Sequence, residues 1–200
     1  DELLQPLKWV EEYDKHPGLQ GLERSLSIYI TQFVAGGADE SDLELLTTTD
    51  WLQKNLHLKR AYFSAFSPIP DTPLENKTAV DPLREHRLYQ ASFLLRDYGF
   101  NLEDLPFTNE ANLPLDEDPK LAWARQNLTE QPIEVNKADR HELIRIPGIG
   151  PKGADAILQA RLKGRLQEIS NLRKLGITIQ RAAPFVLVDG HRIPLQIQMF

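Results

Sequence analysis

Apolar and polar residues alternate in two short stretches in the first third of the chain. The alternation over residues 26–34, and again over 61–66, predicts two β-strands. Between them, Ser41 and Glu44 have the spacing of a capping box, which predicts a helix that runs to about residue 57. A strand, a helix and a strand in this order predict a parallel, right-handed βαβ unit.

Two helix-start signals follow in the middle of the chain. Asp81-Pro82 and Asp118-Pro119 each place an N-cap residue directly before a proline, and proline is favoured at the first position of a helix. We expect the first of these helices to end before Gly99, a glycine suited to the left-handed conformation that closes helices. The second is expected to run through about Asn127.

The last third of the chain predicts short helices joined by glycine turns. They are expected over residues 136–146, 151–163, 169–175 and 178–185. Asp189-Gly190 lies between two apolar runs and predicts a β-hairpin with a type I′ turn. The elements together indicate an α+β chain that is mostly helical. We expect three parts, namely a β/α fragment (1–76), a helical connector (77–131) and a helical module (132–200).

The composition is that of a soluble globular chain, with 41% hydrophobic and 26% charged residues. No apolar run approaches the roughly 18 residues that span a bilayer, and the first residues lack the features of a signal peptide. We therefore expect no membrane partner. Cysteine is absent, which excludes disulfides, thiolate catalysis and cysteine-bound metal clusters, and makes a cytoplasmic location the default. No histidine has ligand-like spacing, so neither a catalytic nor a metal site is expected.

Charge is distributed unevenly along the chain. The net charge is −6, but residues 131–200 carry 11 Lys and Arg against 6 Asp and Glu. Residues 1–130 carry 12 Lys and Arg against 23 Asp and Glu. An acidic body followed by a basic tail directs any polyanion binding to the last third of the chain.

The motif with the clearest chemistry lies in that basic third. Residues 143–157 place Gly148-Ile149-Gly150 between two apolar helical segments, with Ala154 and Ile157 on the second. This pattern resembles the helix-hairpin-helix motif, and the resemblance extends over about residues 133–185. It implies two helices joined by a tight turn, a module that often contacts DNA and in some proteins only packs or contacts another protein.

The physical chemistry of the turn favours a phosphate ligand. Its two glycines allow a sharp turn and a close approach, and the first amides of the second helix have no partner within that helix. The helix dipole favours an anion at these amides, and Lys152 adds a positive charge. The apolar side chain of Ile149 is expected to be buried in the core. The expected phosphate site comprises Arg145, Gly148, Ile149, Gly150, Lys152 and Gly153. Such a site predicts DNA binding that is independent of sequence and sensitive to salt.

A second resemblance concerns the acidic body. The segments are, in chain order, residues 31–40, 62–74, 82–90 and 118–124. They resemble the late part of the radical S-adenosylmethionine (SAM) family, in a subgroup assigned to DNA modification or repair that ends in a helix-hairpin-helix. The resemblance implies part of a β/α barrel over residues 1–76. It also implies a remnant SAM surface at Gly36, Gly37 and Glu40.

The absence of cysteine separates this chain from the chemistry of that family. Radical SAM enzymes hold a [4Fe–4S] cluster on a Cys-x3-Cys-x2-Cys loop, so neither the cluster nor other cofactors are expected in this chain. The leading hypothesis is sequence-independent DNA binding in a protein related to DNA modification or repair. The alternatives are the accessory half of a split or truncated radical SAM enzyme, with the cysteines on a partner chain, and a protein-interaction module. Whether the chain is an enzyme, and its oligomeric state, stay open.

Overall fold

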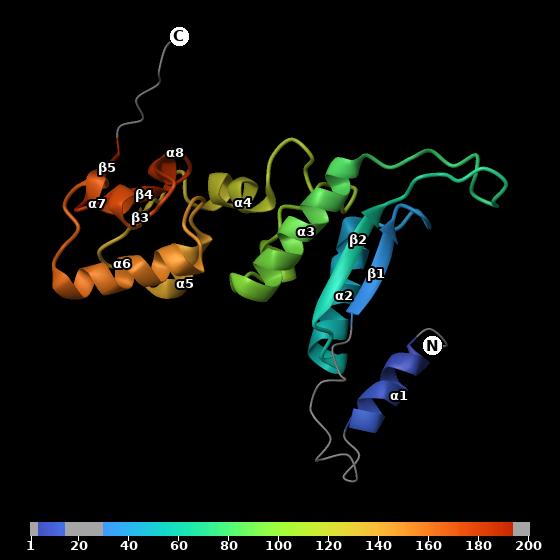
Figure 1. Cartoon of the computed structure of the whole chain (residues 1–200). Coiled ribbons are helices and arrows are strands. Elements are labelled where there is room, and N and C mark those ends of the chain that lie inside the picture. Colours follow the sequence, from blue (N-terminus) through green and yellow to red (C-terminus); the bar gives the residue numbers. More distant parts are fainter. Residues whose placement is uncertain (1–3, 15–29, 194–200) are drawn as a thin grey trace. The chain divides into compact units, whose positions relative to one another are not determined.

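The computed structural model of the chain describes residues 4–14 and 30–193 (Figure 1). The contacts divide the chain into two compact units, Asp1–Ser92 with Phe107–Leu113 and Phe93–Pro106 with Pro114–Phe200. Residues of the expected connector, 77–131, occur in both units. Because helix α3 (Pro82–Asp97) continues from the first unit into the second, the division falls within a helix and not in a linker.

The first unit is built on a strand, a helix and a strand. Strand β1 (Ile30–Ala35) pairs in parallel with β2 (Arg60–Ala65), and α2 (Asp42–Leu56) connects them. Ser41 caps α2 through a complete capping box with Glu44, as the sequence predicts. The parallel pair is thereby confirmed. Residues 26–29 of the expected first strand lie outside the described residues, and helix α1 (Gln5–Asp14) precedes the pair in the chain.

Only one face and one edge of this strand pair are covered by described residues. Phe33 and Phe63 stack on the covered face at 5.9 Å between ring centroids. At the outer edge of β2, the Phe63 N–H donates to the Tyr89 hydroxyl at 3.0 Å, and the Ala65 N–H donates to the Glu85 carboxylate at 2.9 Å. Side chains of α3 therefore occupy donors that a further strand would need. The two strands do not confirm a barrel-like unit.

A buried carboxylate joins three segments of the first unit. Asp42, at the start of α2, is fully buried and accepts a hydrogen bond from Arg84 Nε at 2.7 Å. Its other oxygen accepts from the Leu113 N–H at 2.9 Å. Arg84 also donates to the Glu40 carbonyl at 2.6 Å. The start of α2, helix α3 and the 107–113 loop therefore depend on one ion pair.

The second unit contains the predicted short helices and the β-hairpin. After η2 (Leu102–Asp104), its elements are α4 (Pro119–Asn127), β3 (Ile133–Glu134), α5 (Arg140–Arg145), α6 (Pro151–Lys163), α7 (Ile169–Lys174), α8 (Ile179–Ala182), η3 (Ala183–Phe185), β4 (Val186–Val188) and β5 (His191–Arg192). Asp189 and Gly190 have φ of 54° and 81°, as a type I′ turn requires. Strand β3 pairs in parallel with β4 and was not predicted, because two residues carry no alternation.

The core of the second unit surrounds the turn between α5 and α6. Ile146, Ile149 and Ile157 are fully buried there, together with Leu143 and Leu172. The burial predicted for the Ile149 side chain in this core is thus confirmed. The fold class is α+β with small sheets and a helix-hairpin-helix module, and Figure 1 shows α5 beside α6 within this unit.

Asp42→Ala should strongly destabilise the first unit, because it leaves the enclosed Arg84 guanidinium without its carboxylate. Breaking a buried pair from one side costs about 3–5 kcal/mol. The matched control is Asp50→Ala, which removes an i,i+4 pair with exposed Lys54 and should cost about 0.3–0.5 kcal/mol. Urea unfolding monitored by circular dichroism measures both, and equal losses in the two variants would contradict the structural role of Asp42.

Candidate nucleic-acid interface

The α5–α6 hairpin is defined by local signals at both of its ends. Asp139 caps α5 through a capping box with Glu142, and the helix ends at Arg145, before the C-cap residue Ile146 and Pro147. Gly148 then adopts a φ of +83°, a conformation that favours glycine. Pro151 opens α6 at its first helical position. The turn is therefore short and conformationally restricted.

Two glycines of the motif are required by packing within the unit. A Cβ on Gly148 would lie 2.6 Å from the Thr178 carbonyl oxygen. A Cβ on Gly153 would lie 2.7 Å from Ile177 Cδ1. Both positions face the α7–α8 hairpin, and the Thr178 N–H donates to the Gly148 carbonyl at 3.4 Å. Gly148 and Gly153 thus permit the close approach of two hairpins, which is a role separate from any ligand contact.

Gly150 has different surroundings and leaves the start of α6 open. It is the N-cap residue of α6, and the nearest atom to a Cβ placed there is the Tyr98 hydroxyl oxygen at 3.4 Å. No described residue accepts a hydrogen bond from the N–H groups of Gly150, Lys152 or Gly153. These donors lie at the positive end of a 13-residue helix, an arrangement that suits an anion.

Lys152 and Arg145 differ in whether their charges are available. Lys152 is exposed in the first turn of α6 and forms no ion pair within the described part of the chain. Arg145 instead donates to the Asp104 carboxylate at 2.8 Å and to the Gly99 carbonyl at 2.9 Å. Its guanidinium also lies 4.6 Å from the centroid of the Phe100 ring. Arg145 is occupied by packing, so we leave it out of the proposed phosphate contacts.

The ion pair with Arg145 affects the pKa of the Asp104 carboxyl group. Burial acts to raise the pKa of its carboxyl group, but hydrogen bonds from Arg145 and from the Asn101 N–H outweigh burial and lower that pKa. The pair therefore stays charged at neutral pH. It holds the end of α5 against the residues that follow α3.

Lys120 is a site residue that the sequence analysis missed. Its ammonium donates to the Ile149 carbonyl at 2.6 Å and lies 4.6 Å from the centroid of the Tyr98 ring. Burial lowers the pKa of Lys120 from 10.5 to about 7; Asp118 opposes this shift and Arg181 adds to it. No local signal marks this lysine, because its partners lie 22 and 29 residues away in the sequence.

The α7–α8 hairpin repeats the Gly-Ile pattern but is less open. Gly176 has a φ of +79°, and Ile177 is buried like Ile149. The N–H groups of Gly176, Ile177 and Thr178 donate to backbone carbonyls, and α8 has only four residues. The Thr178 N–H occupies the position equivalent to the Gly150 N–H, so the open amide of Gly150 has no counterpart in the second hairpin.

The remaining basic side chains fall into two groups. Arg140, Arg165 and Arg181 pair with carboxylates, and Arg161 donates to the Ala138 carbonyl. Among the described residues, the exposed side chains without an ion pair include Lys137, Lys163, Arg173 and Lys174. The basic face expected from composition is thus smaller than the charge count indicates.

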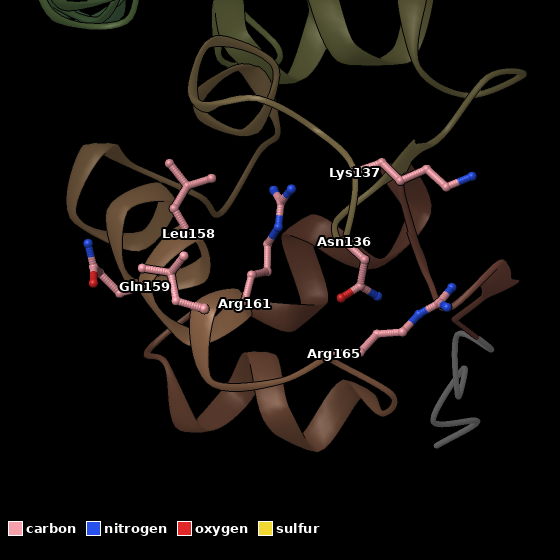
Figure 2. A pocket seen from close by; sticks show the side chains of 7 residues that line it. Asn136, Lys137, Leu158, Gln159, Arg161 and Arg165 are labelled. Carbon is pink, nitrogen blue, oxygen red and sulfur yellow. The ribbon is translucent and has the colours of Figure 1, made fainter.

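A pocket of about 630 Å³ lies at the other end of α6 (Figure 2). Leu158 and Leu162 of α6 form its apolar side, and Arg161 projects between Leu158 and Asn136. Asn136 fixes the opposite wall, because its side-chain amide exchanges two hydrogen bonds with the Leu166 backbone, at 2.8 and 2.9 Å. This pocket is lined by Asn136 and Lys137, which precede α5, and by residues from the C-terminal half of α6 to Arg165, and its lining does not include the Gly148–Gly150 turn.

Gly36, Gly37 and Glu40, the residues expected to form a remnant SAM surface, lie in one loop of the first unit that is held by its own hydrogen bonds. The Glu40 carboxylate accepts hydrogen bonds from the Gly36 N–H and, at 2.9 Å, from the Ala38 N–H. A Cβ on Gly36 would lie 2.3 Å from Val80 Cγ2, and a Cβ on Gly37 would lie 3.3 Å from the Val34 carbonyl oxygen. Burial acts to raise the pKa of Glu40, but these backbone hydrogen bonds outweigh it and lower that pKa. The three residues thus stabilise one another after β1; SAM binding there stays a prediction.

Comparison with protein families identifies one part of the chain. A family model described as a helix-hairpin-helix motif matches residues 129–184. The chain matches no curated protein and no solved structure. No helix in the described part of the chain is both long and apolar enough to cross a membrane. The helix-hairpin-helix resemblance is confirmed, whereas the resemblance of the acidic body to radical SAM proteins stays a prediction.

Gly148→Ala should destabilise the second unit, whereas Gly150→Ala should be tolerated. At position 148 a side chain would meet both an unfavourable φ and the Thr178 carbonyl, and such strain costs on the order of 1–3 kcal/mol. At position 150 φ is −101°, so the cost should stay below about 1 kcal/mol. Chemical denaturation of the two variants checks this order, and a reversed order would rule out the close approach described for Gly148.

Proposed function

We propose that the chain binds duplex DNA through the α5–α6 hairpin and contacts phosphates without recognising base sequence. One observation carries this proposal. The amides of Gly150, Lys152 and Gly153 lie at the start of α6, beside the ammonium of Lys152, and none of these groups has a partner among residues 4–14 and 30–193. Amides and an ammonium are ligands for phosphate oxygens, and such contacts carry no base information. The match to a helix-hairpin-helix motif, which commonly binds DNA non-specifically, supports the same ligand.

The surroundings of the hairpin support a duplex as the ligand. The net charge of residues 131–200 is positive, and Arg173 and Lys174 lie exposed at the end of α7 in the same module. They supply further phosphate contacts at the second hairpin. The total number of contacts is small, so the affinity is in the non-specific range of roughly 10⁻⁴–10⁻⁶ M at physiological salt.

The proposal also concerns the process in which this DNA binding takes part. The resemblance of residues 27–120 to radical SAM proteins of DNA modification or repair supports a role in that chemistry, with the cysteine-bearing half on a partner chain.

Lys152→Glu should weaken binding to all duplexes alike. The variant removes one phosphate contact, so the slope of log affinity against log salt should become shallower by about 1. Lys59→Glu, the matched control, makes the same charge change at an exposed site in the first unit and should leave the slope unchanged. Fluorescence anisotropy with two unrelated duplexes at about 50 and 200 mM salt measures these slopes. Equal slopes for wild type and Lys152→Glu would refute the contact.

Gly150→Val should reduce DNA affinity without changing the net charge. A branched side chain at this N-cap position would cover the amides that face the phosphate. Its Cβ would lie 3.4 Å from the Tyr98 hydroxyl oxygen, an ordinary contact distance, so the fold should persist. The same anisotropy titration, together with circular dichroism as a check of folding, tests this expectation. A folded Gly150→Val protein with wild-type affinity would make the hairpin a packing element only.

A further inference from the structure

Lys120 lies outside the matched segment, yet its ammonium reaches the hairpin. Helix α4 carries it, and its Nζ donates to the Ile149 carbonyl at 2.6 Å. The groups that face it come from several elements. Tyr98 follows α3 and presents its ring, Asp118 caps α4, and Arg181 of α8 forms an ion pair with Asp118. Because Asp118 is shared with Arg181, it only partly neutralises the lysine.

The hydrogen bond from Lys120 acts on the peptide group that contains the open amide of Gly150. The carbonyl of Ile149 and the N–H of Gly150 belong to the same planar peptide unit, which is trans because the chain contains no cis bonds among its described residues. In a trans peptide the C=O and N–H point in opposite directions. A donor fixed on the carbonyl therefore directs the Gly150 N–H away from Lys120, and it polarises that N–H as a donor.

We propose that Lys120 is a positioning residue of the phosphate site, and that the hairpin binds phosphate best when this lysine carries its proton. The charged form donates strongly to the Ile149 carbonyl and places a positive charge behind the open amides. A phosphate at those amides in turn favours the charged lysine, so binding is accompanied by proton uptake. This inference rests on the proposed DNA binding and adds to it a residue and a pH dependence.

The direction of the pH dependence follows from the pKa of the free protein. Burial lowers the pKa of Lys120 to about 7, so the lysine is charged below that pH and loses its proton above it. The affinity for duplex should therefore be highest below about pH 7 and fall as the pH rises. If phosphate prefers the charged form roughly tenfold, the affinity should fall about sixfold between pH 6.5 and 8.5.

Anisotropy titrations of the full chain with one duplex, at constant ionic strength between pH 6.5 and 8.5, test the proton uptake. Lys120→Met should bind more weakly and lose the pH dependence, whereas Lys120→Arg, which stays charged, should bind with little dependence on pH. Lys152→Met, the matched control, should bind more weakly but keep the wild-type profile. A pH dependence that persists in Lys120→Met would come from another group of the chain and would overturn the proposal.

A second measurement needs neither DNA nor a variant. In NMR spectra of the free wild-type protein, the Lys120 Cε and Gly150 N–H resonances should shift with one common midpoint near pH 7. A Lys120 midpoint above about pH 9, or a Gly150 amide that does not follow it, would overturn the positioning role. A protein that shows the common midpoint yet binds no duplex at any pH would overturn the proposed DNA binding and the proton uptake with it, while supporting Lys120 as the residue that orients the hairpin.

Discussion

The burial of Ile149 at the tip of the hairpin is the constraint on which the candidate site depends. Because this side chain lies in the core, the chain must reverse within a few residues, and Gly148 takes the left-handed conformation that the reversal needs. The peptide groups beside a buried tip must then find partners or face solvent. The Ile149 carbonyl finds Lys120, while the Gly150 N–H finds no partner among the described residues. One packing requirement thus produces both the core contact and the open donor.

The three glycines of the hairpin and of the first turn of α6 serve different requirements. Gly148 and Gly153 face the second hairpin at distances that exclude a Cβ, so they belong to the packing of the module. A Cβ on Gly150 would make only an ordinary contact with the Tyr98 hydroxyl at 3.4 Å, so packing within the unit does not require a glycine there. Glycine spacing in a sequence therefore identifies a hairpin more reliably than it identifies a ligand site. The distinction comes from contacts with residues near 178, which are remote in the sequence.

Features set by local chemistry could be predicted, and features set by remote contacts could not. The Ser41 capping box, the proline starts of α3 and α4 and the type I′ turn depend on neighbouring residues, and the structure has them as predicted. The β3–β4 pairing joins segments about fifty residues apart and has no local signature. Arg145 and Lys120 illustrate the same limit for the site. The sequence makes Arg145 a candidate phosphate contact, but in the structure its guanidinium pairs with Asp104. The sequence gives no signal at Lys120, and only the structure places its ammonium on the Ile149 carbonyl.

The division between paired arginines and free lysines explains why the proposed interface would not distinguish base sequences. The arginines of the second unit that face carboxylates are Arg96, Arg125, Arg140, Arg145, Arg165 and Arg181. A planar guanidinium suits such pairs and is also the group that most often recognises guanine in the major groove. The lysines left exposed, among them Lys152, carry a compact charge on a flexible stem and have no fork to match a base edge. Because most of these arginines are paired, the proposed interface offers mainly backbone amides and lysines, with Arg173 as an exposed arginine, and these groups suit phosphates better than base edges.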